Sequence, residues 1–397
     1  MDEGRPVWTA RYEAESGAQI AAMAGALVGV VLGLWLCGGR LTPLWGAETS
    51  VGLVAAFAGA VTGLPTAAIV YLRVASRRVW WRRRHRLRRT LDVAGVSVSA
   101  TAVPALVMLS TFAVFGRAFR DLALDGLAAT TVVALVAAAA GYALALLAYG
   151  LDTRSLAVLL LLFVVGGVFA SMLTADDPAW WTLNFSMLGA GGYTSSAVFN
   201  VTIIVAGVML LTLADYLTIE LRAKRTAARI DGVVVVRTIL VIVGVALSGV
   251  GLVPVDVNVA VHNTFAITAL VGFATLMGAT PALVDGLPRT FLALTTVFAI
   301  AIGVIVLLFW PVRYLNLTAV ELLAVLLIFV WLIMFTRNTP ARARTVAPVT
   351  APAPVDTPGA LRRKGRSGPD GAARALGAAA TLVIGAVIGA AIARRRT

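Results

Sequence analysis

The stretch SLAVLLLLFVVGGVFASML, residues 155–173, decides the fold. No side chain in this stretch carries a charge. Because the hydrocarbon core of a bilayer is about 30 Å thick and a helix rises about 1.5 Å per residue, the run is long enough to cross a membrane. A strand or loop in lipid would leave backbone groups without hydrogen bonds, so the segment must be helical.

Similar apolar runs recur along the whole chain. The composition agrees, since 60% of the residues are hydrophobic and 13% are charged, whereas soluble domains are roughly 45–50% apolar and about 25% charged. The sequence therefore predicts an all-α fold, a polytopic transmembrane helical bundle of about ten spans. The predicted spans are residues 18–38, 51–72, 93–116, 127–149, 155–173, 196–219, 233–253, 262–284, 291–310 and 317–335.

These spans divide the chain into five regions. The prediction is a cytoplasmic N-terminus at 1–17, a four-helix transmembrane region at 18–150, a six-helix transmembrane region at 151–338, a disordered Pro-, Ala- and Arg-rich linker at 339–371 and an apolar helix at 372–397. The linker has too little apolar content to offset the entropy of ordering it.

The C-terminal run, residues 372–393, has the length of an eleventh span. Crossing would place the three arginines at 394–396 outside, against the positive-inside rule, so an in-plane or hairpin placement stays open. Gly385 and Gly389 form a small-xxx-small pair that lets another helix approach closely. We therefore expect another membrane protein as a possible partner of this segment.

Basic residues indicate the orientation. The segment 73–89 carries nine arginines and His85, and such loops face the cytoplasm. With ten spans, both ends of the bundle are then cytoplasmic. The acidic residues in 1–17 and the long apolar run after them argue against a cleavable signal peptide. The excess of Arg over Lys is typical of a high-GC bacterial genome, so we expect a multi-pass protein of a bacterial plasma (inner) membrane.

The net charge of +14 is a signal of topology, because the basic residues lie in short segments between apolar runs. We therefore expect membrane lipids as partners and no nucleic acid. A basic residue near the cytoplasmic leaflet gains about 1 kcal/mol from the surface potential. The alternative is a topogenic anchor with no specific ligand. The candidate contacts to anionic lipids are Arg82, Arg83, Arg84 and Arg86.

The sequence predicts no metal and no cofactor. Cys37 is the single cysteine, and the two histidines, His85 and His262, fall on opposite sides of the predicted membrane. No glycine loop of the type that holds a nucleotide phosphate follows a predicted strand. We assign no catalytic residue from these patterns.

Polar residues gather at the outer ends of the later spans. Polar groups at membrane depth are costly and mark function, but most of these residues lie outside that depth. Their gathering at one end still makes this candidate binding cluster the best region for a site. The simpler alternative is an interfacial belt with ordinary loop residues. Its members are Asp176, Asp177, Trp181, Asn184, Ser186, Asn200, Asp256, His262, Asn263 and Glu321.

His262 is the cluster's candidate general base. It would need a nucleophile within hydrogen-bond reach, and Ser186, Ser195 and Ser196 are the possibilities.

Asp215 is the deepest acidic residue in a predicted span. Two readings stay open for it. It is a candidate member of an ion or proton relay, or it forms an ion pair with Arg222 or Arg225 near the cytoplasmic end of the span.

The segment WTLNFSMLGAGGYTSSAVFNVTIIVAGVMLL, residues 181–211, contains a turn at Ser186, Leu188 and Gly189 and a helix start at Phe199 and Asn200. It resembles the bacterial membrane family called domain of unknown function 998, akin to the DRAM-like group of six-helix proteins. The resemblance covers about residues 155–337. It implies a noncatalytic or lipid-linked role.

Three functions follow as hypotheses. The first is a multi-pass plasma-membrane protein that binds a lipid or another membrane protein and performs no chemistry. The second is a secondary transporter of ten helices. Pro65, Pro104 and Pro281 are the candidate helix breaks, although they form no matching pair in two halves of the chain. The third is an outer-face lipid-modifying enzyme centred on His262.

Overall fold

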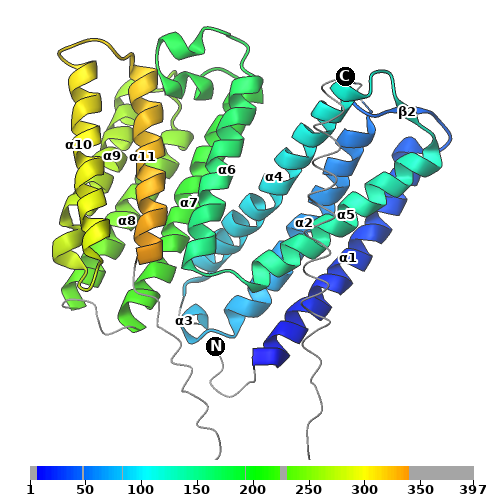
Figure 1. Ribbon diagram of the computed structural model, residues 1–397, viewed down its shortest axis with the longest axis horizontal. Coiled ribbons are helices and arrows are strands. Elements are labelled where there is room, and N and C mark those ends of the chain that lie inside the picture. The colour runs from blue at the N-terminus through cyan, green and yellow to red at the C-terminus, as the bar shows by residue number, and fades with distance from the viewer. Residues whose placement is uncertain (1–6, 47–48, 83, 193, 224–229, 339–397) are drawn as a thin grey trace, which may run out of the picture. The chain divides into compact units, whose positions relative to one another are not determined.

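The computed structural model describes residues 7–46, 49–82, 84–192, 194–223 and 230–338. Within these ranges, ten helices are long and apolar enough to cross a membrane (Figure 1). The prediction of an all-α polytopic bundle with ten spans is confirmed. The helices are α1 (Val7–Cys37), α2 (Val51–Ser76), α4 (Arg86–Ala118), α5 (Gly126–Tyr149), α6 (Thr153–Leu173), α7 (Thr194–Ala223), α8 (Ile230–Leu252), α9 (Val259–Leu283), α10 (Arg289–Phe309) and α11 (Leu317–Asn338).

Five short elements lie between these helices. The strands β1 and β2 pair antiparallel, with Thr42 opposite Leu124. The two 3₁₀ helices η1 and η2 build the loop between α6 and α7. The bounds are α3 (Val79–Arg82), β1 (Thr42–Pro43), β2 (Ala123–Leu124), η1 (Trp180–Thr182) and η2 (Phe185–Gly189).

Two helices begin well before the predicted spans. Helix α1 begins at Val7 where residue 18 was predicted, and α4 begins at Arg86 where residue 93 was predicted. The added turns carry charged residues. Hydropathy does not count such residues as part of a span, but the helix itself continues past the hydrocarbon core. In α1, Glu13 Oε2 accepts from Arg77 at 3.0 Å and Glu15 Oε1 accepts from Tyr142 at 2.7 Å. The predicted N-terminal tail is thus helical from Val7.

The predicted linker at 339–371 and the C-terminal helix at 372–397, with Gly385 and Gly389, lie outside the described residues.

The helices pack mainly with neighbours on each side of α4. Helices α2 and α5 each pack against α1 and α4 and against each other, and α6 to α9 pack in chain order. Helix α11 packs on α6 and α10 (Figure 1). Helix α4 also contacts α6 and α7, so it joins the first four spans to the last six.

Proline does not break these spans. Pro65, Pro104 and Pro281 lie inside α2, α4 and α9, and each helix continues through its proline. The helix breaks that the transporter hypothesis sought at these three residues do not occur.

Polar contacts sort the described residues into two ends. One end, which we call the basic end, contains Arg77, Arg84, Arg154 and Arg337 at the ends of α2, α4, α6 and α11. Arg77 pairs there with Glu13, and Arg154 Nη2 donates to the Arg337 carbonyl oxygen at 3.5 Å. The other end, which we call the loop end, contains η1, η2 and the starts of α9 and α11. This division is the one that alternating spans require.

A glycine stripe brings α1 against α5. A Cβ at Gly25 would lie 2.3 Å from the Ala137 carbonyl oxygen, and one at Gly29 would lie 2.5 Å from the Ala134 Cα. Both distances are too short for any side chain. In lipid there is no hydrophobic driving force for helix association, so helices associate through close packing. Small residues allow the two backbones to approach in this way.

We predict that Gly29→Leu separates α1 from α5 and lowers the thermal unfolding temperature of the detergent-purified protein. The matched control is Gly303→Leu in α10, where an added Cβ meets no atom within 4 Å. The control is expected to unfold at the wild-type temperature. Equal unfolding temperatures for the two variants would contradict this account of the α1–α5 contact.

Candidate functional site

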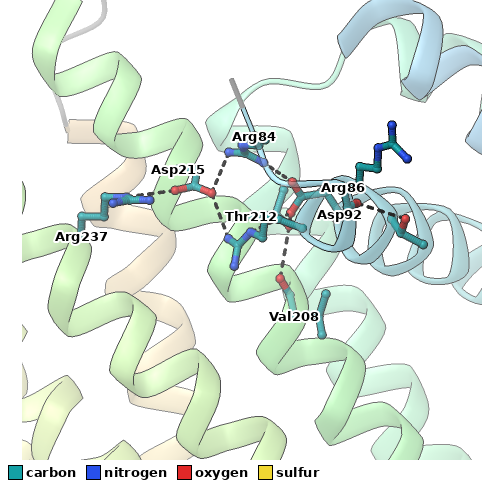
Figure 2. A network of polar contacts seen from close by, with 9 residues as sticks. Arg84, Arg86, Asp92, Val208, Thr212, Asp215 and Arg237 are labelled. Carbon is teal, nitrogen blue, oxygen red and sulfur yellow. Dashed lines mark hydrogen bonds and ion pairs between the residues drawn. The ribbon is translucent and has the colours of Figure 1, made fainter. Parts of the chain in front are cut away.

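A buried ion network lies at the basic end, where α4 meets α7 and α8 (Figure 2). Two carboxylates form its centre, Asp92 of α4 and Asp215 of α7. Arg84, which precedes α4, bridges them: it pairs with Asp92 Oδ2, and its Nη2 lies 2.7 Å from Asp215 Oδ2. The early start of α4 places Arg88 one turn before Asp92.

Further donors complete the two carboxylates. Arg88 Nη2 donates to Asp215 Oδ2 at 2.9 Å, and its Nε lies 3.4 Å from Asp92 Oδ1. Arg237 of α8 donates from Nε to Asp215 Oδ1 at 3.1 Å. The Thr212 hydroxyl donates to Asp92 Oδ1 at 2.7 Å. Every carboxylate oxygen of the pair therefore accepts at least one polar hydrogen.

Burial makes this pairing obligatory. The Asp92 side chain is 1% exposed and the Asp215 side chain is 8% exposed. A carboxylate withdrawn from water is tolerated only when it is paired and hydrogen-bonded. The network thus joins α4 to α7 and α8 through charge.

The structure places Asp215 with three arginines, Arg84, Arg88 and Arg237. The sequence had offered Arg222 and Arg225 as partners; Arg222 is exposed, and Arg225 lies outside the described residues. The relay hypothesis for Asp215 stays a prediction.

The candidate lipid contacts separate into two kinds. Arg84 points inward to the two carboxylates, with a side chain 11% exposed. Arg82 and Arg86 are exposed at the basic end, and Arg83 lies outside the described residues.

At the loop end, the predicted cluster ties the loop between α6 and α7 to later helices. Glu321 of α11 accepts from the Phe185 backbone N–H at 2.6 Å, and Asp256 accepts from the Gly191 N–H at 2.8 Å. The Asn200 amide donates to the Gly189 carbonyl oxygen at 2.9 Å. These residues, far apart in sequence, therefore converge on η2 and the glycines after it.

His262 joins the same loop to α9. Its Nδ1 lies 2.8 Å from the Val253 carbonyl oxygen and its Nε2 lies 3.0 Å from the Ser186 hydroxyl. A carbonyl oxygen only accepts, so Nδ1 carries the proton and, in the neutral ring, Nε2 accepts from Ser186. Of the three serines considered from sequence, Ser186 is the one within reach. Ser195 instead bonds Ser171, and Ser196 donates to the Gly191 carbonyl oxygen.

The remaining members of the cluster lie nearer the surface. Asp176 and Asp177 line a cavity of about 410 Å³ beside the loop, together with Trp180. Trp181 is 52% exposed, and Asn263 is exposed. Asn184 is half-buried and precedes η2, and its carbonyl oxygen accepts from the Met187 N–H. The cluster is therefore not one pocket. Some of its residues form hydrogen bonds that hold the loop between α6 and α7, and others line a small cavity beside that loop.

A larger groove lies between α4, α5 and α6. Its volume is about 720 Å³, within the roughly 300–1,000 Å³ of small-molecule sites. The walls are apolar except at the basic end. The lining residues are Ala100, Val103, Pro104, Val107 and Met108 of α4, Ala143, Leu144 and Leu147 of α5, Arg154, Ser155, Val158, Leu159 and Leu162 of α6, and Arg337 of α11.

No group of three or more His, Cys, Asp or Glu side chains in the described part of the chain is arranged to hold a metal ion.

In comparisons with known proteins, no family profile, no characterised protein and no solved structure matches the chain. The class is therefore defined by the fold itself, as a multi-pass membrane protein with an ion network at one end and a tied loop at the other. The likeness to domain of unknown function 998 stays a prediction.

Sequence reasoning missed Asp92, Arg88 and Arg237. A signal was present for two of them, because Arg88 and Asp92 have the four-residue spacing of a helical ion pair. The positive-inside rule places Arg88 in a cytoplasmic loop, where a four-residue spacing does not indicate a helical pair. Arg237 carried no such signal, since its partner lies 22 residues away on another helix.

We predict that Asp92→Asn destabilises the protein, because Arg84 loses one of its two buried carboxylate partners. Removing one partner of a buried ion pair costs about 3–5 kcal/mol. The measurement is thermal unfolding in mild detergent. The matched control is Glu13→Gln, whose pair with Arg77 is exposed and is worth about 0–1 kcal/mol. Similar losses in both variants would show that the network is not structural.

Proposed function

We propose that the protein is a multi-pass protein of a bacterial plasma membrane, with a cytoplasmic N-terminus, that binds a membrane lipid without acting on it. The apolar groove between α4, α5 and α6 carries this proposal. It supports lipid binding because it is large and lined almost wholly by hydrocarbon side chains. The resemblance to domain of unknown function 998, itself a proposal, implies a lipid-linked role as well.

The groove also reaches the side of the bundle that faces lipid. Two of its lining residues, Val107 and Leu162, are 59% and 48% exposed. Its floor is closed, since Leu144 and Leu159 are 2% and 4% exposed. A lipid chain can therefore enter sideways from the bilayer and lie against packed helices.

We predict that Ala143→Trp reduces the amount of lipid that co-purifies with the protein. Ala143 is exposed and lines the groove, so the indole fills the space without crowding the core. Mass spectrometry of the intact protein, released from mild detergent, counts the retained lipids. The wild type is expected to retain lipid and the variant to retain much less.

The control for this experiment is Ala274→Trp, at an exposed position of α9 outside the groove. It is expected to retain lipid as the wild type does. A wild type that keeps no lipid, or equal retention in all three proteins, would refute lipid binding in the groove.

A second candidate function rests on the Ser186–His262 pair. The neutral His262 ring accepts from the Ser186 hydroxyl, which is the arrangement of a general base beside a nucleophile. In this function the Ser186 oxygen bonds the carbonyl carbon of a lipid ester, and His262 moves the hydroxyl proton to the departing alcohol. Water then releases the acyl group from the serine.

If this second function holds, a fluorophosphonate probe labels Ser186 in the folded protein. Labelling is expected to vanish in Ser186→Ala, to fall strongly in His262→Ala and to persist in Ser195→Ala, because Ser195 has Ser171 as its partner. Peptide mass spectrometry locates the label. An unlabelled wild type would reduce the pair to a tie between the loop and α9.

A further inference from the structure

Two arginines lie side by side at the basic end of the groove. Arg154 is in the first turn of α6, Arg337 is in the last turn of α11, and both line the groove. The Arg154 guanidinium donates to the Arg337 carbonyl oxygen at 3.5 Å. The apolar groove therefore ends at two arginines that line it together.

Neither charge is neutralised by the described residues. The ion pairs in that part of the chain include neither Arg154 nor Arg337. Asp152, the nearest acid in sequence, caps α6 instead, accepting from the Ser155 N–H at 2.8 Å and from the Ser155 hydroxyl at 2.9 Å. The first turn of a helix favours an anion and disfavours a cation such as Arg154. A bound anion would offset the unfavourable position of Arg154, whereas Arg337, in the last turn of α11, lies where a cation is favoured.

The depth of the groove fits one leaflet. From Arg154 to Leu162, the last lining residue of α6, is 162 − 154 = 8 residues, or about 12 Å of helix. Half of the hydrocarbon core is about 15 Å thick. Since α6 begins at Thr153, the wall that α6 contributes starts at the level of lipid headgroups and ends near the middle of the bilayer.

The arginines must supply the preference for a ligand. An acyl chain in the bilayer is already surrounded by hydrocarbon, so entering the groove brings no hydrophobic gain. A guanidinium group, in contrast, donates two parallel hydrogen bonds to a phosphate. A choline or ethanolamine headgroup would add a cation beside the two arginines, whereas an anionic headgroup would not.

We infer that the groove is a site for an anionic phospholipid, with its phosphate at Arg154 and Arg337 and one acyl chain along α6; this inference rests on the proposed function. The ligand comes from the leaflet at the basic end. Its headgroup supplies the anion that the two arginines lack among the described residues.

The test is lipid retention from vesicles of equal parts phosphatidylcholine and phosphatidylglycerol. The full chain is reconstituted, extracted in mild detergent and analysed by mass spectrometry for the ratio of the two bound lipids. The wild type is expected to retain mostly phosphatidylglycerol. Arg154→Gln and Arg337→Gln are each expected to lower the ratio about fivefold, with a larger fall in the double variant.

Arg289→Gln is the matched control, because Arg289 is an exposed arginine in the first turn of α10 and does not line the groove. The control is expected to keep the wild-type ratio, and thermal unfolding confirms that each variant is folded. Retained lipid with equal amounts of the two headgroups, or an equal fall in the control, would overturn the inference and leave the groove as a lipid site. Absence of any retained lipid would instead overturn the proposed function.

Discussion

The arrangement of helices depends on one constraint: the buried carboxylates of Asp92 and Asp215 must each pair with arginines. Neither carboxylate reaches water freely, so each must find positive charge within the protein. The available arginines come from the segment around the start of α4 and from α8. The ion pairs of the two acids therefore hold α4 against α7, and α8 against α7. Because α4 also forms one wall of the groove, the same contacts hold that wall in place.

At the loop end, carboxylates are also paired, but with backbone N–H groups in place of arginines. Its carboxylates, Glu321 and Asp256, accept from backbone N–H groups of the loop, while His262 and Asn200 hold a hydroxyl and a carbonyl oxygen. The loop lies over the ends of spanning helices and lacks the regular backbone hydrogen bonds of a long helix. Its backbone groups therefore need side-chain partners. The polar residues that first suggested a site are thus largely engaged in placing the loop. Among these contacts, the Ser186–His262 hydrogen bond is the one for which we also propose a chemical function, that of a nucleophile and its general base.

Hydropathy predicted the spans because crossing a bilayer imposes a simple requirement on each segment, length without charge. It failed at Val7 and Arg86, where charged residues continue a helix beyond the hydrocarbon. It did not predict the partners of Asp215, because Arg88 lies 127 residues away and meets it only after α4 packs on α7. The groove was equally hidden, since it arises from the spacing of three helices. By contrast, the residues converging on η2 were predicted as a group, because alternation of spans places them at one end.

The proposed lipid site depends on a difference between two pairs of arginines, one in the ion network and one at the groove. Arg84 and Arg88 lie beside buried acids, and their charges are consumed in holding helices together. Arg154, which is half-buried, and Arg337, which is exposed, line the groove without an acid partner among the described residues. Buried acids take up the charges of Arg84 and Arg88, whereas Arg154 and Arg337 line an apolar groove, and this contrast supports the proposed place for an external anion. In a bilayer, the anion nearest to that place is the headgroup of a lipid whose chain already lies beside the groove.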